Sequence, residues 1–329
     1  MRQLSQFLAK RFGQGVFVVW GVITAVFVLR GISPTNPAQL AAPTDATAEQ
    51  IQQIAEELGL TRPIYEQYFA YLIEVAQGDL GYSYITSTPV APQIFGKLGA
   101  TIELAVFGIL FALVLSIPLG VISSTRRNEA PDYVANLSSL VGVSTPNFWL
   151  AIMLVLLLSV QIDLLPTSGR PVGFLGVIGA LAAFQIDPLV SWVSHMVLPT
   201  LALGTYLMAL MTRLTRSGMI EELSKPYVQT NRAKGLPEVL NRYKHALRNS
   251  LAPVVTVVGL QLGRLIGGSV VIESVFAWPG IGSLFIRAVN TADWPIIQGT
   301  LIVVGIAYVL VNIGVDLVYA QLDPQVVVT

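Results

Sequence analysis

The stretch LAVFGILFALVLSIPLGVISST, residues 104–125, contains no acidic or basic side chain. A run of this length can cross a bilayer as one helix, because the hydrocarbon is about 30 Å thick and an α-helix rises about 1.5 Å per residue. Four more charge-free runs occupy residues 12–29, 133–162, 188–212 and 294–315. Together these runs predict a protein that crosses the membrane several times.

The composition agrees with that prediction. The chain has 329 residues, of which 53% are hydrophobic and 12% are charged, whereas a soluble domain carries about 25% charged residues. A sixth apolar run, 250–272, is interrupted only by Arg264. We therefore expect an all-α polytopic membrane protein. Its six transmembrane helices are predicted at about 12–30, 99–124, 134–160, 196–214, 250–272 and 296–320.

The domain organisation follows from these spans. Residues 1–98 are expected to hold an anchor helix and an extracytoplasmic loop, and residues 99–320 a transmembrane domain. A cytoplasmic loop is predicted at 215–249 and a short cytoplasmic tail at 321–329. The stretch 172–186 is apolar but short and rich in Gly, so we expect an interfacial or re-entrant segment there.

The first span also resembles a signal peptide, because basic residues precede its apolar core. That core is longer than the usual 7–15 residues and Arg30 follows it directly, which favours an uncleaved anchor. With the N-terminus inside, the cytoplasmic segments hold 13 of the 19 Lys and Arg, and the outside segments hold five. Because basic loops stay in the cytoplasm, both termini are expected there.

The long outside loop has its own helical pattern. Thr47 and Gln50 have the spacing of a capping box before a first short helix, and Gly59 is predicted to end it. Pro63 begins a second helix, and GDLGYS (78–83) follows as a turn. Two amphipathic helices on the outer membrane face or on a partner fit this pattern, and so does a solvated connector.

Motifs of catalysis are missing from the sequence. It contains no HExxH, no GxSxG and no Walker pattern GxxxxGK[ST], which argues against a metalloprotease, a hydrolase and an ATPase. No cysteine is present, and the two histidines, His195 and His245, are expected to be structural or solvated. We expect no metal site and no cofactor, and we find no basic block that suggests nucleic-acid binding.

Three ionisable residues lie in or near the spans, namely Glu103, Arg264 and Asp316. A charge inside a membrane usually faces a partner or a cavity. Glu103 and Arg264 are placed near the same membrane face and are predicted to form an intramembrane pair, or alternatively Arg264 lines a substrate route. Asp316 is expected at the depth of Arg213. The four-residue spacing of Gly259, Gly263 and Gly267 suggests close helix packing, which includes packing on a second subunit.

The cytoplasmic loop concentrates positive charge. Residues 227–253 hold five basic residues and one acid, Glu238. Pro226 can start a short helix at Tyr227 and Gly235 can end it. A second helix is predicted from Val239 to Asn249, with Leu240, Tyr243 and Leu247 on one side. The charge alone fits a topology signal, but two helices with a Gly-Pro bend fit a docking element for a soluble partner.

The loop sequence YVQTNRAKGLPEVLNRYKHALRNSLAPVV (227–255) resembles that of inner-membrane permeases of binding-protein-dependent ABC importers. It is most similar to the dipeptide, oligopeptide and nickel permeases, in the B-type subunit with a large first outside loop. The resemblance covers nearly the whole chain. It includes LGLTRPIYEQYFAYL, GDLGYS, HMVLPTLALG, RLTRSGMIEEL, VIESVFAWPGIGSLFIRAV, DWPIIQG and VNIGVDLVYAQLDP.

The resemblance implies the type I transmembrane fold of ABC importers and a role for the loop in coupling to an ATPase subunit. The residues that match the coupling pattern are Tyr227, Val228, Thr230, Asn231, Arg232, Ala233, Lys234 and Gly235. Two of the loop's residues depart from the pattern. Asn231 stands where Ala is usual, and Pro226 stands where an acid is common.

The implied partners are a second homologous permease, two ATP-binding subunits that use ATP and Mg²⁺, an extracytoplasmic binding protein and membrane lipid. The implied cargo is a di- or oligopeptide, with nickel or an oligosaccharide as alternatives in the same family. A stand-alone secondary transporter would usually have paired interrupted helices and inverted repeats, and neither is evident in the sequence. A polytopic membrane enzyme would need catalytic motifs that the sequence lacks.

Overall fold

The computed structural model describes residues 2–43 and 45–322. All regular elements in this part of the chain are helices, so the predicted all-α class is confirmed. From residue 323 onward, the expected tail lies outside the described residues. The elements are α1 (Arg2–Ile32), α2 (Pro37–Ala41), α3 (Ala48–Glu57), α4 (Ile64–Ala76), α5 (Val90–Thr125), α6 (Ala130–Ser144), α7 (Asn147–Leu154), the π-helix η1 (Val155–Gln161), α8 (Phe174–Ala182), α9 (Asp187–Ser224), α10 (Pro226–Ala233), the π-helix η2 (Leu240–Ala246), α11 (Leu247–Ser250), α12 (Ala252–Ile266), α13 (Val270–Val275), α14 (Ile281–Asn290) and α15 (Trp294–Leu322).

Within the described residues, four helices are long and apolar enough to cross a membrane: α1 over Ala9–Ile32, α5, α9, and α15 over Trp294–Leu317. The number rises to six if each of two bent pairs forms one span. The first pair joins α6 to α7 and η1 with a bend of 101°, and the second joins η2 and α11 to α12 with a bend of 45°. Both α5 and α9 extend well beyond the predicted ranges 99–124 and 196–214.

The prediction of one continuous helix over 134–160 was wrong, because the chain breaks between α6 and α7 at Thr145 and Pro146. Proline has no amide hydrogen and disfavours a helical backbone in the residue before it. Accordingly, Thr145 is extended, with ψ of 122°. The span predicted over 250–272 also ends early, at Ile266. Gly268, with φ of +92°, follows that end.

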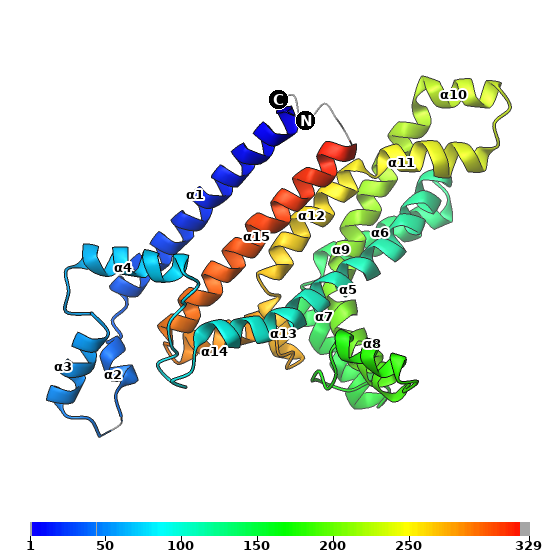
Figure 1. Cartoon of the computed structure of the whole chain (residues 1–329). Coiled ribbons are helices and arrows are strands. Elements are labelled where there is room, and N and C mark those ends of the chain that lie inside the picture. Colours follow the sequence, from blue (N-terminus) through cyan, green and yellow to red (C-terminus); the bar gives the residue numbers. More distant parts are fainter. Residues whose placement is uncertain (1, 44, 323–329) are drawn as a thin grey trace. The chain divides into compact units, whose positions relative to one another are not determined.

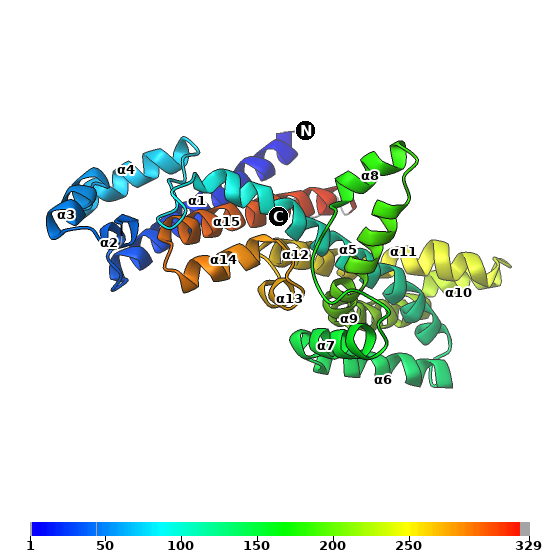
Figure 2. The same ribbon diagram turned by 90° about the horizontal axis from the view of Figure 1, so that it is seen from below.

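The chain divides into two compact units, the first made of Met1–Thr101, Ile266–Val270 and Pro279–Thr329. In the described part of this unit, α1 and α15 run side by side (Figure 1 and Figure 2). Arg11 Nε and Asp316 Oδ2 join them at 3.0 Å, so Asp316 pairs with Arg11. A hydrophobic core forms where α14 packs on α15 and the start of α5. Its buried members are Val90, Ile94, Ile281, Leu284, Ala288, Ile296, Ile297 and Val303.

The loop after α1 holds α2, α3 and α4 in the first unit. Thr47 and Gln50 form the predicted capping box, with Thr47 N donating to Gln50 Oε1 at 2.8 Å and Gln50 N to Thr47 Oγ1 at 3.4 Å. Gly59, just past the end of α3, has φ of +67°, which only Gly adopts at low cost. Both short helices of the outside loop are therefore confirmed as helices.

The second unit comprises Ile102–Leu265 and Val271–Trp278, and α9 is its central helix. Within it α6, α7, α8, α10 and α11 all pack on α9. Glycines allow the closest approaches. A Cβ added at Gly204 would lie 2.5 Å from the Phe111 ring, and one at Gly142 would lie 2.9 Å from Ala209 Cβ. The apolar stretch 172–186 forms the short helix α8 in this unit.

Candidate functional site

The docking helix predicted in the loop is α10, which turns off the end of α9 and projects at one end of the second unit (Figure 1). Lys225 separates the two helices in an extended conformation. The other end of α10 has the Gly-terminated Schellman cap. Gly235 has φ of +77°, its N–H donates to Arg232 O at 2.9 Å, and Leu236 N donates to Asn231 O at 3.0 Å. The predicted stop at Gly235 is therefore confirmed.

A carboxylate fixes the base of α10. Glu222, buried near the end of α9, accepts hydrogen bonds from Tyr227 Oη at 2.8 Å, from Asn249 Nδ2 at 3.4 Å and from Lys225 Nζ. These donors come from the start of α10, from α11 and from the residue between α9 and α10. We call this group the Glu222 node. Burial raises the pKa of the Tyr227 hydroxyl, and its bond to Glu222 raises it further.

The tip of the loop is exposed. Arg232 Nε pairs with Glu238 Oε1 at 2.7 Å across the bend, which holds the pKa of the Glu238 carboxyl below its usual value. Ala233, Lys234 and Gly235 are open to solvent. The remaining residues of the predicted coupling set differ in exposure. Val228 is fully buried, Asn231 is half-buried, and Thr230 is exposed.

The second helix of the loop differs from its prediction. Most of it is the π-helix η2, followed by α11. A π-helix bonds residue i to i+5 and shifts the side chains around the axis, so Leu240, Tyr243 and Leu247 do not share one packed side. Leu247 packs against a core of Val121, Met219 and Ala246, whereas Leu240 and Tyr243 are exposed. These two side chains add apolar surface to the exposed tip.

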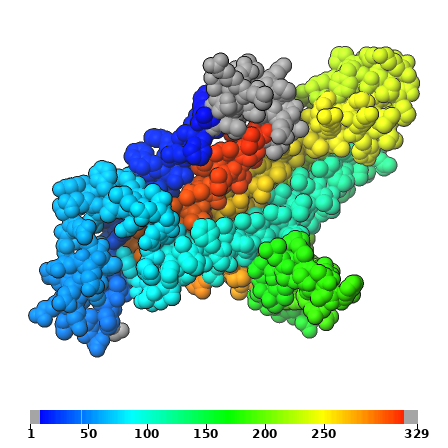
Figure 3. Space-filling model, viewed as in Figure 1, coloured from blue at the N-terminus to red at the C-terminus, as the bar shows by residue number. Residues whose placement is uncertain are grey.

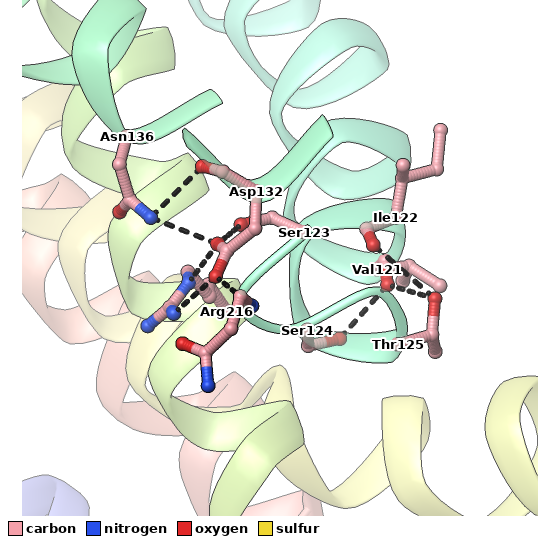
Figure 4. Close-up of polar contacts among 9 residues, drawn as sticks. Val121, Ile122, Ser123, Ser124, Thr125, Asp132, Asn136 and Arg216 are labelled. Carbon is pink, nitrogen blue, oxygen red and sulfur yellow. Dashed lines mark hydrogen bonds and ion pairs between the residues drawn. The ribbon is translucent and has the colours of Figure 1, made fainter. Parts of the chain in front are cut away.

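Sequence reasoning missed a buried polar cluster centred on Asp132 in α6 (Figure 4). Its carboxylate binds Arg216 of α9 through two contacts, Nε to Oδ1 at 2.7 Å and Nη2 to Oδ2 at 2.8 Å. Ser123 Oγ, Asn128 N and Asn136 Nδ2 also donate to it. We call this group the Asp132 cluster. It ties the α5–α6 turn to α9, and no spacing in the sequence indicated it, since Asp132 and Arg216 lie 84 residues apart.

The predicted pair of Glu103 with Arg264 is replaced by another. Glu103 is buried in the second unit and pairs with Arg170. It also accepts from Phe174 N at 3.1 Å and from Trp192 Nε1 at 2.6 Å. The loop before α8 folds back onto α5 and α9 and satisfies this carboxylate, which hydropathy could not reveal. Arg264 is exposed on α12.

The predicted glycine motif is only partly helical. Gly259 and Gly263 are buried in α12, but Gly267 lies in the turn after the helix has ended. Because a continuous helix would be needed to align all three, the motif does not form one packing stripe. Close approaches between helices of the second unit instead occur at Gly108, Gly120, Gly142 and Gly204.

Both histidines have ordinary surroundings. His195 lies in α9, where its Nδ1 contacts Ser191 O at 2.7 Å, and His245 is half-buried in η2. Residues 2–43 and 45–322 contain no group of three or more His, Cys, Asp or Glu that is arranged to hold a metal ion.

The fold and this site define a class of protein: a multi-pass helical membrane protein with a short helix, α10, that the Glu222 node holds at one end of the second unit. Comparisons with known proteins narrow the class. Residues 116–328 match the family of binding-protein-dependent transport system inner membrane components, and residues 4–105 match the N-terminal family of such components. The chain therefore belongs to this family, which forms the permeases of ABC importers with the type I membrane fold.

Related proteins cover nearly the whole chain. It is 39% identical to the dipeptide transport system permease protein of Alkalihalophilus pseudofirmus, over 94% of this chain and 95% of that protein. The dipeptide transport system permease protein of Escherichia coli K12 is 37% identical, over 98% and 99%. The glutathione transport system permease protein of Escherichia coli O6:H1 is 36% identical, over 93% of each chain.

Proposed function

We propose that this chain is the permease subunit of an importer that carries di- or oligopeptides across the cytoplasmic membrane. The observation that carries the proposal is similarity over nearly the full length to permeases named for dipeptides and for glutathione, itself a small peptide. Nickel and oligosaccharides are the alternative cargoes. The chain itself binds no cofactor and catalyses no reaction in this proposal.

ATP and Mg²⁺ are used by two partner subunits, and α10 transmits their movement. The exposed residues at its tip, Arg232, Ala233 and Lys234, would enter a cleft of the ATPase. The Glu222 node supports this role, because hydrogen bonds from both sides of the loop hold α10 at a fixed angle to α9. A rigid base lets a push on the tip move α9 instead of bending the loop. The bundle then changes the side to which its cavity opens, as a two-state element.

The remaining partners are a second homologous permease and an extracytoplasmic binding protein. Both termini lie in the cytoplasm in this arrangement, on the ground that 13 of 19 basic residues fall in the segments then inside. Gly259 and Gly263 are assigned to close helix packing inside this chain, where both are buried. Arg264, exposed on its helix, is assigned to the translocation route, and we assign Glu103 a supporting role in holding the loop before α8.

The test is uptake of a radiolabelled dipeptide by proteoliposomes that contain this chain, the second permease, both ATPases and the binding protein. ATP-dependent uptake, lost when any subunit is omitted, is the expected result. Uptake of nickel or an oligosaccharide and not of peptide would change the cargo. Transport by this chain alone, without the ATPases, would replace the proposal with a secondary transporter.

A further inference from the structure

The helix α4 packs against α1 within the first unit. Thr24 Oγ1 of α1 lies 2.6 Å from Tyr68 Oη of α4. One turn along α1, the Phe27 ring packs against Tyr68 with a centroid separation of 5.2 Å and against Tyr71 at 5.8 Å. These contacts fix which part of α1 carries α4.

The contacts lie inside the membrane-spanning part of α1, which runs over Ala9–Ile32. Thr24 is eight residues before Ile32, or about 12 Å along the helix axis, and Phe27 is about 8 Å before it. The hydrocarbon core of a bilayer is about 30 Å thick and its polar interface adds several Å on each side. A helix attached at Thr24 and Phe27 therefore lies no farther out than the membrane interface.

A second side of α4 is apolar and unoccupied in this unit. Tyr65, Phe69 and Ile73 follow one another at four-residue spacing, so they share one face. Each exposes more than half of its surface. The acid Glu74 projects from the opposite side of the helix, whereas Glu66 borders the apolar face beside Phe69 and Ile73. Figure 3 shows the segment 64–76 in light blue at the surface of its unit. This pattern, apolar on one side and charged on the other, is typical of helices that lie in a membrane interface.

The chain around the start of α4 offers positive charge. A cavity of about 700 Å³ opens where α1 ends and α4 begins, and no acidic residue is among those that line it. Arg30 and Arg62 border it, together with the apolar side chains of Ile32 and Ile64. Guanidinium groups beside exposed apolar side chains suit the phosphate and the acyl chains of a phospholipid. A soluble partner would need a matching acidic and apolar surface.

We infer that α4 is an interfacial helix that inserts Tyr65, Phe69 and Ile73 among the lipids of the leaflet at the Ile32 end of α1. The exposed Arg62 faces the phospholipid headgroups there, whereas Arg30 is half-buried and also lines a second cavity with Glu74. In the proposed orientation this is the outer leaflet. This placement gives the outside loop a fixed height at the membrane, because a helix held in the interface resists movement along the bilayer normal.

The test uses the absence of cysteine in the chain. Single variants Phe69→Cys and Ile73→Cys are labelled with an environment-sensitive fluorophore, and Glu74→Cys on the opposite side of the helix is the matched control. All three positions are exposed, so labelling leaves the packing intact. The chain is reconstituted with its second permease and ATPases in vesicles of phosphatidylethanolamine and phosphatidylglycerol. Quenching is measured with nitroxide-bearing lipid and, separately, with iodide in the aqueous phase.

The expected result is several-fold stronger quenching by nitroxide lipid at positions 69 and 73 than at 74, with the reverse order for iodide. Equal iodide quenching at all three positions would overturn the inference, because the helix would then lie in water. Labels at 69 and 73 that become shielded from iodide only when the binding protein is added would also overturn it and would assign the face to that protein.

Discussion

Replacing the buried Asp132 with alanine should destabilise the second unit far more than replacing an exposed residue of the same turn. The carboxylate receives two contacts from Arg216, at 2.7 and 2.8 Å, and further hydrogen bonds from Ser123, Asn128 and Asn136. Its side chain is only 3% exposed. Alanine therefore leaves a guanidinium without its anion and two or more donors without an acceptor in a place that water reaches poorly.

The size of the effect follows from the burial of the two partners. Removing one member of a buried ion pair costs about 3–5 kcal/mol. Arg216 keeps 23% of its side chain exposed, so its charge can find some water and the lower figure applies. We expect a loss of about 3 kcal/mol in the free energy of unfolding, which is about two orders of magnitude in the unfolding equilibrium.

Denaturant titration of the purified chain in lipid nanodiscs measures this loss. Glu129→Gln is the matched control, because it removes an exposed acid from the same turn and should change the free energy by less than about 0.5 kcal/mol. Arg216→Ala and the double variant complete a thermodynamic cycle. The double variant should cost clearly less than the sum of the single ones. A loss for Asp132→Ala no larger than that of the control, or strict additivity in the cycle, would refute the reasoning.

Three further outcomes are expected. Tyr227→Phe removes one donor from the carboxylate of Glu222, should cost about 1.5 kcal/mol locally and should lower the ratio of peptide transported to ATP hydrolysed; an unchanged ratio in the reconstituted importer would contradict it. Gly235→Pro should leave membrane insertion intact and uncouple ATP hydrolysis from transport, because proline cannot adopt the positive φ of the cap; normal uptake by a well-expressed variant would count against this. Gly204→Ala should destabilise the second unit by about 1–3 kcal/mol, because the added Cβ would overlap the Phe111 ring. Gly13→Ala should cause no such loss, because no atom lies within 4 Å of its added Cβ. Equal denaturation midpoints for the two variants would exclude the contact with Phe111 as the cause.

The sequence predicted the spans well where hydropathy alone decides them. The run 104–125 lies within α5, and 294–315 lies within α15. Helix ends were less predictable. The first turns of α5, from Val90 onward, are not part of an apolar run, and they are helical in a segment whose apolar side chains pack on α14 and α15. The break at Pro146 had a local signal, a proline after threonine. The prediction passed over it because apolar residues on both sides form one charge-free run.

Polar pairings were beyond the reach of sequence reasoning. Glu103 and Arg264 were matched by estimated depth in the membrane, but depth says nothing about which helix faces which. The actual partner, Arg170, belongs to a loop whose path depends on where α8 packs. The cap at Gly235 was predictable for the opposite reason. It depends on the backbone of a few neighbouring residues, and glycine is the residue that adopts a positive φ at low cost.

Three polar groups of the second unit share one helix, α9. The Asp132 cluster attaches it to the α5–α6 turn, the Glu222 node attaches it to α10, and Trp192 contacts Glu103 of α5. If α9 carries movement from α10 to α5 and α6, the Glu222 node and the Asp132 cluster act in series. Disrupting both groups should then lower the ratio of transport to ATP hydrolysis little more than disrupting one of them. Combining Asp132→Ala with Tyr227→Phe should therefore give additive losses of stability, because the two groups share no residue, but less than additive losses in the ratio of transport to ATP hydrolysis. Additive losses in both quantities would mean that the two groups affect coupling separately, and that α9 does not transmit movement from one group to the other.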